Sequence, residues 1–271
     1  MRASDMMRTA ILTGLALSSL LVATGSALAN LRAPRTEGAM PSSVVGAPVG
    51  DLHAQVVHED LAFRCHQKTC QVTATYQLEA DRAARVTLDF ILPVNVRVSA
   101  RKGTSVVPVS LTSAASDLAE FRRRLAVDYY EFSILRSAPA LYRASATVDF
   151  VAGRNQVTFE YDQSLAATET DYGYFHAGRM VRKLLYVLWP LKEWSRAKDF
   201  QIGLSIEIDR APPSWWKRTF GHPTNVSCRD FRGQRSQVGD QLVYRATIGD
   251  PFPDYLDCQI GDDDLVEESA R

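Results

Sequence analysis

The chain has 271 residues, of which 46% are hydrophobic, and its 31 lysines and arginines balance 31 aspartates and glutamates. This length is enough to bury a sizeable core as one or two domains. A net charge of zero removes the electrostatic case for nucleic-acid binding, which depends on a basic surface.

The first 29 residues have the features of a secretory signal peptide. Arg2 and Arg8 flank a charged start, and the apolar run Thr9–Ala29 ends in the small-x-small sequence Ala27-Leu28-Ala29. A membrane anchor is the alternative, because about 20 apolar residues can span a bilayer. The run is interrupted by Thr, Ser and Gly. We therefore predict an exported protein, periplasmic or extracellular, that does not span the membrane after cleavage.

Four cysteines follow, and Cys65 and Cys70 are predicted to form a disulfide across a hairpin. Their spacing of four residues does not fit a thioredoxin-like redox pair, which needs two, or a zinc site, which repeats a short gap or adds histidines. Export would place the chain where disulfides persist. Cys228 and Cys258 are then the second pair, and all four cysteines are expected to be oxidised.

The hairpin register follows from two alternating segments that meet at Gln67-Lys68. Folding them together places apolar side chains opposite one another, as directly opposed cross-strand pairs require. The expected pairs are Cys65 with Cys70, Phe63 with Val72, Leu61 with Ala74 and Val57 with Leu78.

Glu59 is the exception in this register, because it falls on the apolar face opposite Tyr76. A buried carboxylate is costly unless it is paired or hydrogen-bonded, and buried acids are candidates for functional groups. The favoured interpretation is that a bulge or a strand end lets Glu59 reach solvent.

Further short strands are predicted along the rest of the chain. Residues 143–151 and 155–162 alternate on either side of a turn sequence, Ala152–Asn155, and should pair as a hairpin. Residues 199–209 place Phe200, Ile202, Leu204, Ile206 and Ile208 on one face. Residues 181–191 are apolar on both faces near their end, which is compatible with a central strand or with the start of a helix.

These patterns predict a mainly β fold, an antiparallel β-sandwich of one or two units with one short helix near residues 116–126. The predicted segments in chain order are a signal peptide (1–29), a flexible linker or arm (30–50), an N-terminal β-sandwich unit (51–165), a C-terminal β unit packed on it (166–260) and a disordered acidic tail (261–271).

Residues 171–194 combine many aromatic side chains with a few polar ones and are the candidate binding surface. Aromatic residues give a large apolar area with hydrogen-bonding edges, which favours recognition. The alternative is that this segment folds back and plugs an open end of the sandwich. The candidate ligand-binding residues are Tyr172, Tyr174, His176, Arg179, Trp189 and Trp194.

We therefore expect a non-catalytic binding or interaction module of the cell envelope, with an envelope polysaccharide or protein as partner and no nucleic acid. The alternatives are a purely structural scaffold and a hydrolase built on Asp171, His176 and Glu59. The sequence contains no G-x-S-x-G or H-E-x-x-H motif, and no S-x-x-K motif accompanied by S-D-N and K-T-G. No catalytic residue, metal ligand or cofactor is predicted.

Three stretches resemble a class of secreted bacterial β-sandwich proteins of unknown function, the DUF4424-like kind. They are the start "HEDLAFRC…CQVTATYQL", the strand "VTLDFILP" and the segment "YVLWPLKEWSRAKDFQIGLSIEI". The resemblance covers about a third of the chain. It implies a sandwich fold and an envelope location, and it brings no active-site residues.

Overall fold

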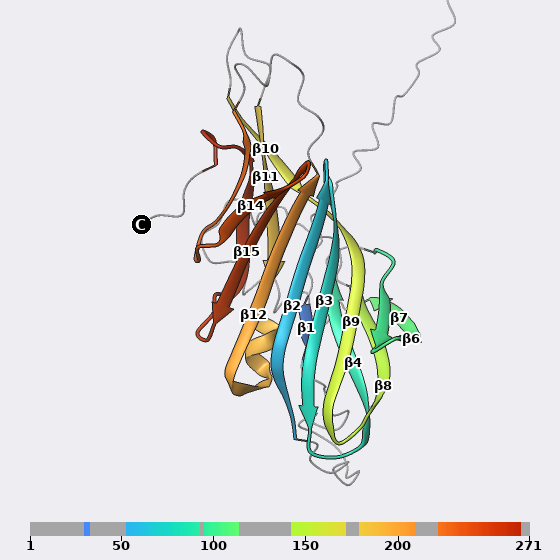
Figure 1. Ribbon diagram of the computed structural model, residues 1–271. Helices are drawn as coiled ribbons and strands as arrows, with labels where there is room; N and C mark the ends of the chain where they lie inside the picture. The colour runs from blue at the N-terminus through green and yellow to red at the C-terminus, as the bar shows by residue number, and fades with distance from the viewer. Residues whose placement is uncertain are drawn as a thin grey trace, which may run out of the picture.

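The computed structural model describes residues 30–32, 53–92, 95–113, 142–171, 179–209 and 222–266. These residues form three β-sheets (Figure 1), and the one helix among them is the 3₁₀ turn η2 (Trp189–Glu193). The predicted mainly β fold is confirmed. The helix predicted near 116–126 lies outside the described residues.

The largest sheet has eight strands and forms one layer of the sandwich. Its strands in spatial order are β14 (Gln234–Val238), β15 (Gln241–Gly249), β12 (Ser195–Asp209), β2 (Ala54–His66), β3 (Thr69–Ala80), β9 (Gly153–Ser164), β5 (Ser99–Lys102) and β6 (Ser105–Val107). Strands β2 and β12 run parallel and every other neighbouring pair runs antiparallel. The sheet is therefore mixed, which differs from the antiparallel prediction.

Two four-stranded sheets form the second layer. One contains β1 (Asn30–Arg32), β4 (Ala84–Leu92), β8 (Tyr142–Phe150) and β7 (Val109–Ser113) in that order. The other contains β10 (Ala166–Asp171), β11 (Arg179–Val187), β16 (Tyr255–Asp262) and β13 (Thr224–Cys228).

Both small sheets pack on the same face of the large sheet through aromatic contacts. Phe90 of β4 stacks on Phe159 of β9 with ring centroids 5.1 Å apart, and Phe63 of β2 meets Tyr186 of β11 edge-on at 5.7 Å. The five residues predicted to line one face of 199–209 are all buried. The alternation in the sequence therefore gives the correct inner face for β12.

The β2–β3 hairpin has the predicted register near its turn and departs from it at the far end. Cys65, Phe63, Leu61 and Glu59 lie opposite their expected partners, but Leu78 pairs with Val56 because the register shifts between Val56 and His58. Val57 is therefore the extra residue of a β-bulge, and the predicted Val57–Leu78 pair is wrong. The bulge moves Val56, not Val57, to the buried face.

Strands β8 and β9 do not form the predicted hairpin. Strand β8 pairs with β4 and β7 in a small sheet, whereas β9 pairs with β3 and β5 in the large one. The side chain of Asn155 organises the connection, since its Oδ1 accepts from the Val151 N–H at 2.9 Å and its Nδ2 donates to the Val151 carbonyl at 2.9 Å. The chain therefore crosses between layers at this turn.

Regular structure extends into the predicted linker and into the predicted acidic tail. The first three residues of the predicted linker form β1, and residues 261–266 continue as the end of β16 and a turn in which Val266 is buried. The large sheet contains strands from both 51–165 and 166–260. Strand β11 shows that 181–187 is a strand, the second in its sheet, and that η2 follows it directly. The division into two units stays a prediction.

Candidate functional site

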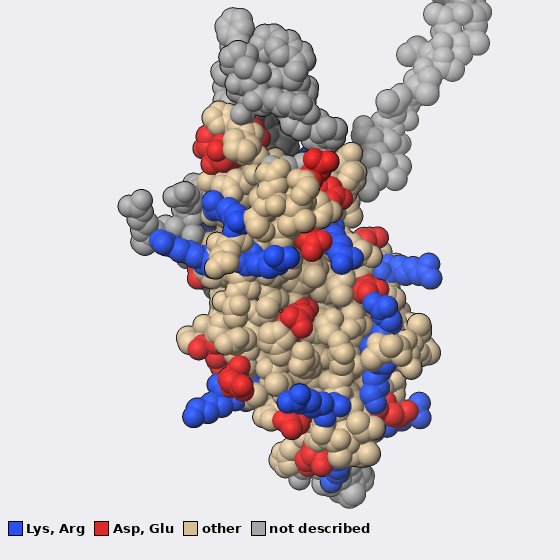
Figure 2. All heavy atoms as spheres, viewed as in Figure 1, with Lys and Arg blue, Asp and Glu red and all other residues tan. Residues whose placement is uncertain are grey.

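An open groove lies on the outer face of the large sheet, where β2, β12 and β15 run side by side. Its volume is about 610 Å³, which is within the usual range for small-molecule sites. Figure 2 shows this face, with acidic and basic side chains spread over a largely uncharged surface. The residues that line the groove are Asp60, Leu61, Ala62, Gly203, Leu204, Ser205, Arg232, Gly233, Gln234, Arg245, Ala246 and Thr247.

The groove is deepened at Gly203, because glycine leaves the middle strand without a side chain. Gly203 lies directly between Asp60 of β2 and Thr247 of β15 in the strand register. A Cβ at this position would lie 2.9 Å from Asp60 Oδ1. The glycine therefore gives the Asp60 carboxylate the space to lean over β12.

His58 holds that carboxylate in place. Its Nε2 lies 3.0 Å from Asp60 Oδ1, and the two side chains are 28% and 58% exposed. The pair forms because residues two apart on a strand point to the same face. Asp60 Oδ2 accepts no hydrogen bond from the described part of the chain and remains available to a ligand.

Two arginines stand on the other side of the groove. Arg245 projects from β15 and Arg232 from the segment before β14, and neither forms an ion pair or a side-chain hydrogen bond within the described residues. Gly233 allows that segment to approach β15 closely, because a Cβ there would lie 2.4 Å from the Tyr244 ring and 2.6 Å from the Arg245 carbonyl. The Tyr244 hydroxyl also donates to the Phe231 carbonyl at 3.4 Å. The loop is thus held against β15, with Arg232 at the rim.

A second polar cluster lies inside the sandwich and is centred on Glu59. Glu59 is fully buried, so the prediction that a bulge would bring it to solvent is wrong: the bulge is at Val57 and leaves Glu59 facing inward. The Tyr186 hydroxyl donates to Glu59 Oε1 at 3.4 Å and lies 3.4 Å from the Tyr76 hydroxyl. Glu59 Oε2 has no hydrogen-bond partner among the described residues.

Burial sets the protonation state of this cluster. Loss of solvation raises the pKa of Glu59 to about 8, against the smaller effects of hydrogen bonds from Tyr76 and Tyr186, while the nearby charge of Asp60 raises it slightly further. The same burial raises the pKa of Tyr161 and of Tyr186 well above 10. At neutral pH the cluster is therefore uncharged.

The tryptophans of the predicted binding segment lie in the interior. Trp189 and Trp194 are each 5% exposed, in and directly after η2. They do not form an aromatic surface. Their burial agrees better with the alternative that this segment folds back and plugs an end of the sandwich. Tyr172, Tyr174 and His176 lie outside the described residues, as does the side chain of Arg179 at the start of β11, so their role stays a prediction.

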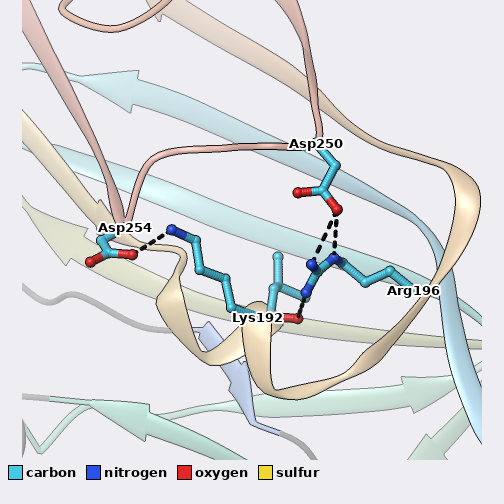
Figure 3. Close-up of polar contacts among 5 residues, drawn as sticks. Lys192, Arg196, Asp250 and Asp254 are labelled. Carbon is cyan, nitrogen blue, oxygen red and sulfur yellow. Dashed lines mark hydrogen bonds and ion pairs between the residues drawn. The ribbon is translucent and has the colours of Figure 1, made fainter.

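Ion pairs fix η2 and the start of β12 to the loop between β15 and β16 (Figure 3). Lys192 Nζ lies 2.6 Å from Asp254 Oδ1, and Arg196 contacts Asp250 Oδ2 at 3.1 Å through both Nε and Nη2. Arg196 also donates to the Leu191 carbonyl at 3.2 Å. The ring of Phe252 is buried, and its centroid lies 5.4 Å from both Lys192 Nζ and Arg196 Cζ. This contact set stabilises the end of the sandwich that contains the buried tryptophans.

Both predicted disulfides are present. Cys65 bonds to Cys70 and Cys228 bonds to Cys258, in each case between directly opposed residues of neighbouring strands. Disulfides persist in oxidising compartments, so the two bonds indicate an extracytoplasmic environment. Within the described part of the chain, no helix is long and apolar enough to cross a membrane.

One surface cluster has no counterpart in the sequence analysis. His222 Nδ1 lies 3.1 Å from Asp263 Oδ1 and 3.4 Å from Asp264 Oδ1, and all three side chains are exposed. These groups are 41 residues apart in the chain, so no local spacing reveals them. Mutual ion pairing accounts for their arrangement.

No family model and no curated protein sequence matches this chain. Solved structures with a similar course of the chain include a putative nutrient binding protein from Legionella pneumophila, with a TM-score of 0.48, 11% identity, and 76% of this chain and 67% of that chain covered. They also include an M1 zinc metallopeptidase from Deinococcus radiodurans (TM-score 0.43, 12% identity, 79% and 44% covered). Yeast LTA4 hydrolase matches with a TM-score of 0.41, 13% identity, and 77% and 29% covered.

The present chain spans less than half the length of the M1 zinc metallopeptidase and of yeast LTA4 hydrolase. Similarity at this level concerns the course of the backbone and transfers no active-site residue.

Proposed function

We propose that this protein is exported and acts as a non-catalytic binding module of the cell envelope, with the groove between His58, Asp60, Gly203, Arg232 and Arg245 as its binding surface. One observation carries the proposal. The oriented carboxylate of Asp60 lies on one side of the open groove, and on the other side lie the guanidinium groups of Arg232 and Arg245, which have no ion-pair partner among the described residues.

This surface replaces the aromatic segment as the main binding candidate. Binding surfaces need side chains that reach solvent, and the described tryptophans of 171–194 do not. Most groove residues, by contrast, lie on regular strands of a disulfide-bonded sheet, and Arg232 and Gly233 lie in the segment directly before β14. A site on rigid strands loses little conformational entropy when a ligand binds.

The partners we propose are an envelope polysaccharide or an envelope protein. Export is supported by the predicted signal peptide and by the two disulfides. A binding role is supported by the size of the groove and by the charged side chains of Asp60, Arg232 and Arg245 that line it. The competing role is a scaffold that binds no ligand on this face.

A steric block of the groove tests the proposal. The purified disulfide-bonded protein is screened against an array of envelope polysaccharides and envelope-protein peptides, together with Thr247→Trp, which fills the groove from its β15 side. Gln156→Trp on β9 is the matched control, because Gln156 is exposed but does not line the groove. We expect Thr247→Trp to lose retention at least tenfold and Gln156→Trp to keep it. No retention of any array member, or equal retention by all three proteins, overturns the proposal in favour of the scaffold.

A further inference from the structure

We propose that the groove recognises a carboxylate-bearing sugar chain, an acidic polysaccharide segment. The inference rests on the proposed function, because it names the chemistry of the ligand for that same groove.

The two arginines of the groove provide the first reason. Arg64, on the same face of the large sheet, is paired with Glu207 at 3.4 Å, whereas Arg232 and Arg245 form no such pair within the described residues. A guanidinium group binds a carboxylate through two parallel hydrogen bonds, and this geometry makes arginine the preferred partner of planar anions. Two unpaired guanidinium groups in one groove therefore fit a ligand with carboxylates.

Asp60 provides the second reason and favours a sugar over an acidic peptide. An ionised carboxylate only accepts hydrogen bonds, and Asp60 is oriented toward the groove through its contact with His58. Sugar hydroxyls are donors that an Asp60 oxygen can accept. The side chains of an acidic peptide are acceptors at neutral pH, and they would be repelled by Asp60.

The distance between Asp60 and Arg245 suits a ligand that is too long to be a single carboxylate group. In the strand register Asp60 lies opposite Gly203, and Arg245 lies opposite Ser205. Asp60 and Arg245 are thus two strands apart across the sheet and two residues apart along it. With strands ~4.8 Å apart and a rise of ~3.4 Å per residue, their Cα atoms are about 12 Å apart. A sugar chain can present a hydroxyl to one end of this span and a carboxylate to the other.

The rest of the lining combines small polar side chains with apolar residues of the strands. Ser205, Gln234 and Thr247 supply hydroxyl and amide groups, which match sugar hydroxyls as both donors and acceptors. No aromatic residue is among the lining residues that the structure describes. Without an aromatic face for a sugar ring to stack on, recognition here depends mainly on ionic and hydrogen-bonding contacts, so the charge of the ligand should strongly affect its affinity.

Isothermal titration calorimetry with three tetramers tests the inference: tetragalacturonate, its fully methyl-esterified form and tetraglutamate. The ester keeps the sugar chain and removes the negative charges, while tetraglutamate keeps the charges and removes the sugar. We expect tetragalacturonate to bind the parent protein at least tenfold more tightly than either of the others. Raising the salt from about 50 to about 200 mM should weaken this binding, because exposed charge interactions are screened.

Substitutions inside and outside the groove test whether tetragalacturonate binds there. Arg232→Gln/Arg245→Gln should lose at least tenfold in affinity for tetragalacturonate, whereas Arg154→Gln, an exposed arginine of β9 outside the groove, should not change it. Asp60→Asn removes a repulsive charge for both anionic tetramers, but for the sugar it also removes a strong acceptor of a hydroxyl hydrogen bond. The substitution should therefore lower the preference for tetragalacturonate over tetraglutamate, and an unchanged preference would count against a hydroxyl contact at Asp60.

Each outcome decides between the two proposals. Equal binding of the acid and the ester, or tighter binding of tetraglutamate, overturns the sugar-acid inference while leaving the groove as a binding surface. Binding that survives Arg232→Gln/Arg245→Gln also overturns it. Failure of all three tetramers overturns the inference alone if Thr247→Trp still abolishes retention on the array. Both proposals fail if the array shows no groove-dependent ligand.

Discussion

The hydroxyl of Tyr186 lies 3.4 Å from Glu59 Oε1, and this hydrogen bond joins the two layers of the sandwich. Glu59 belongs to β2 of the large sheet and Tyr186 to β11 of a small one. Gln163 of β9 makes a second polar contact between the layers, donating to the Leu185 carbonyl of β11 at 2.8 Å. The interior is therefore held by apolar packing and by a small polar cluster whose central acid is protonated.

Stability should depend on pH through Glu59. The folded protein keeps the Glu59 proton up to a pKa of about 8, whereas the unfolded chain releases it near the ordinary value of 4.5. Between these values the unfolded state binds fewer protons, so the free energy of unfolding falls as pH rises, by about 1.4 kcal/mol per pH unit from this group alone. Above pH 8 both states are ionised and the loss stops growing.

Glu59→Gln should remove this dependence, because the amide stays neutral in both states. Urea unfolding of the parent and the variant from pH 5 to pH 9 measures the difference between the two curves, which cancels the contribution of other groups. Asp162→Asn, an exposed acid of β9, is the matched control and should follow the parent. Parallel curves for parent and Glu59→Gln would show that Glu59 is ionised in the folded state.

Removing a tyrosine hydroxyl should lower the free energy of unfolding only where that hydroxyl is hydrogen-bonded. Tyr186→Phe keeps the edge-on contact with Phe63 but loses the bond to Glu59, so we expect a loss of about 1 kcal/mol and a higher pKa of Glu59. Tyr161→Phe removes a buried hydroxyl that has no hydrogen-bond partner among the described residues, and it should be neutral or slightly stabilising. Urea unfolding of both variants checks the order, and equal losses would contradict it.

The two disulfides should contribute unequally to the free energy of unfolding. They are separated by 5 and 30 residues in the chain, and closing a longer loop removes more entropy from the unfolded state. The chain-entropy model gives about 2 kcal/mol for Cys65–Cys70 and about 4 kcal/mol for Cys228–Cys258. Unfolding of Cys65→Ala/Cys70→Ala and Cys228→Ala/Cys258→Ala measures both, and a larger loss for the first pair would reject this account.

Arg196 should contribute more to the stability of the fold than Lys192, although each forms one ion pair (Figure 3). The Lys192–Asp254 pair is exposed at 39% and 52%, and such pairs contribute about 0–1 kcal/mol. Arg196 is 22% exposed and also donates to the Leu191 carbonyl. We expect Arg196→Ala to cost about 1–2 kcal/mol more than Lys192→Ala. Thermal unfolding of both variants at low and high salt tests this, and equal Tm values would count against it.

Local patterns in the sequence predict a good part of this fold. The side-chain period of two residues identifies the buried face of β12 and the register of Cys65, Phe63 and Leu61. It fails at Val57, because a bulge inserts a residue that alternation cannot reveal. It also fails for β8 and β9, since a short turn sequence is compatible both with a hairpin and with a crossing between layers.

The candidate groove could not be predicted, because its residues come from distant parts of the chain. Asp60, Gly203 and Arg245 meet only because β12 inserts between β2 and β15. Gly203 gives no local signal of its role: its importance depends on the Asp60 carboxylate of the neighbouring strand. Aromatic content, in contrast, gives a strong sequence signal at 189–194 that turns out to belong to the core.

The sequence alone determined the strand-rich composition, the oxidised cysteine pairs and most inward-facing positions, because these depend on residue type and on spacing within one segment. Only the tertiary structure decided that Glu59 is buried, that both small sheets pack on the same face, and that a charged groove forms on the other. Those features depend on which strands become neighbours, and that choice is made by packing over the whole chain.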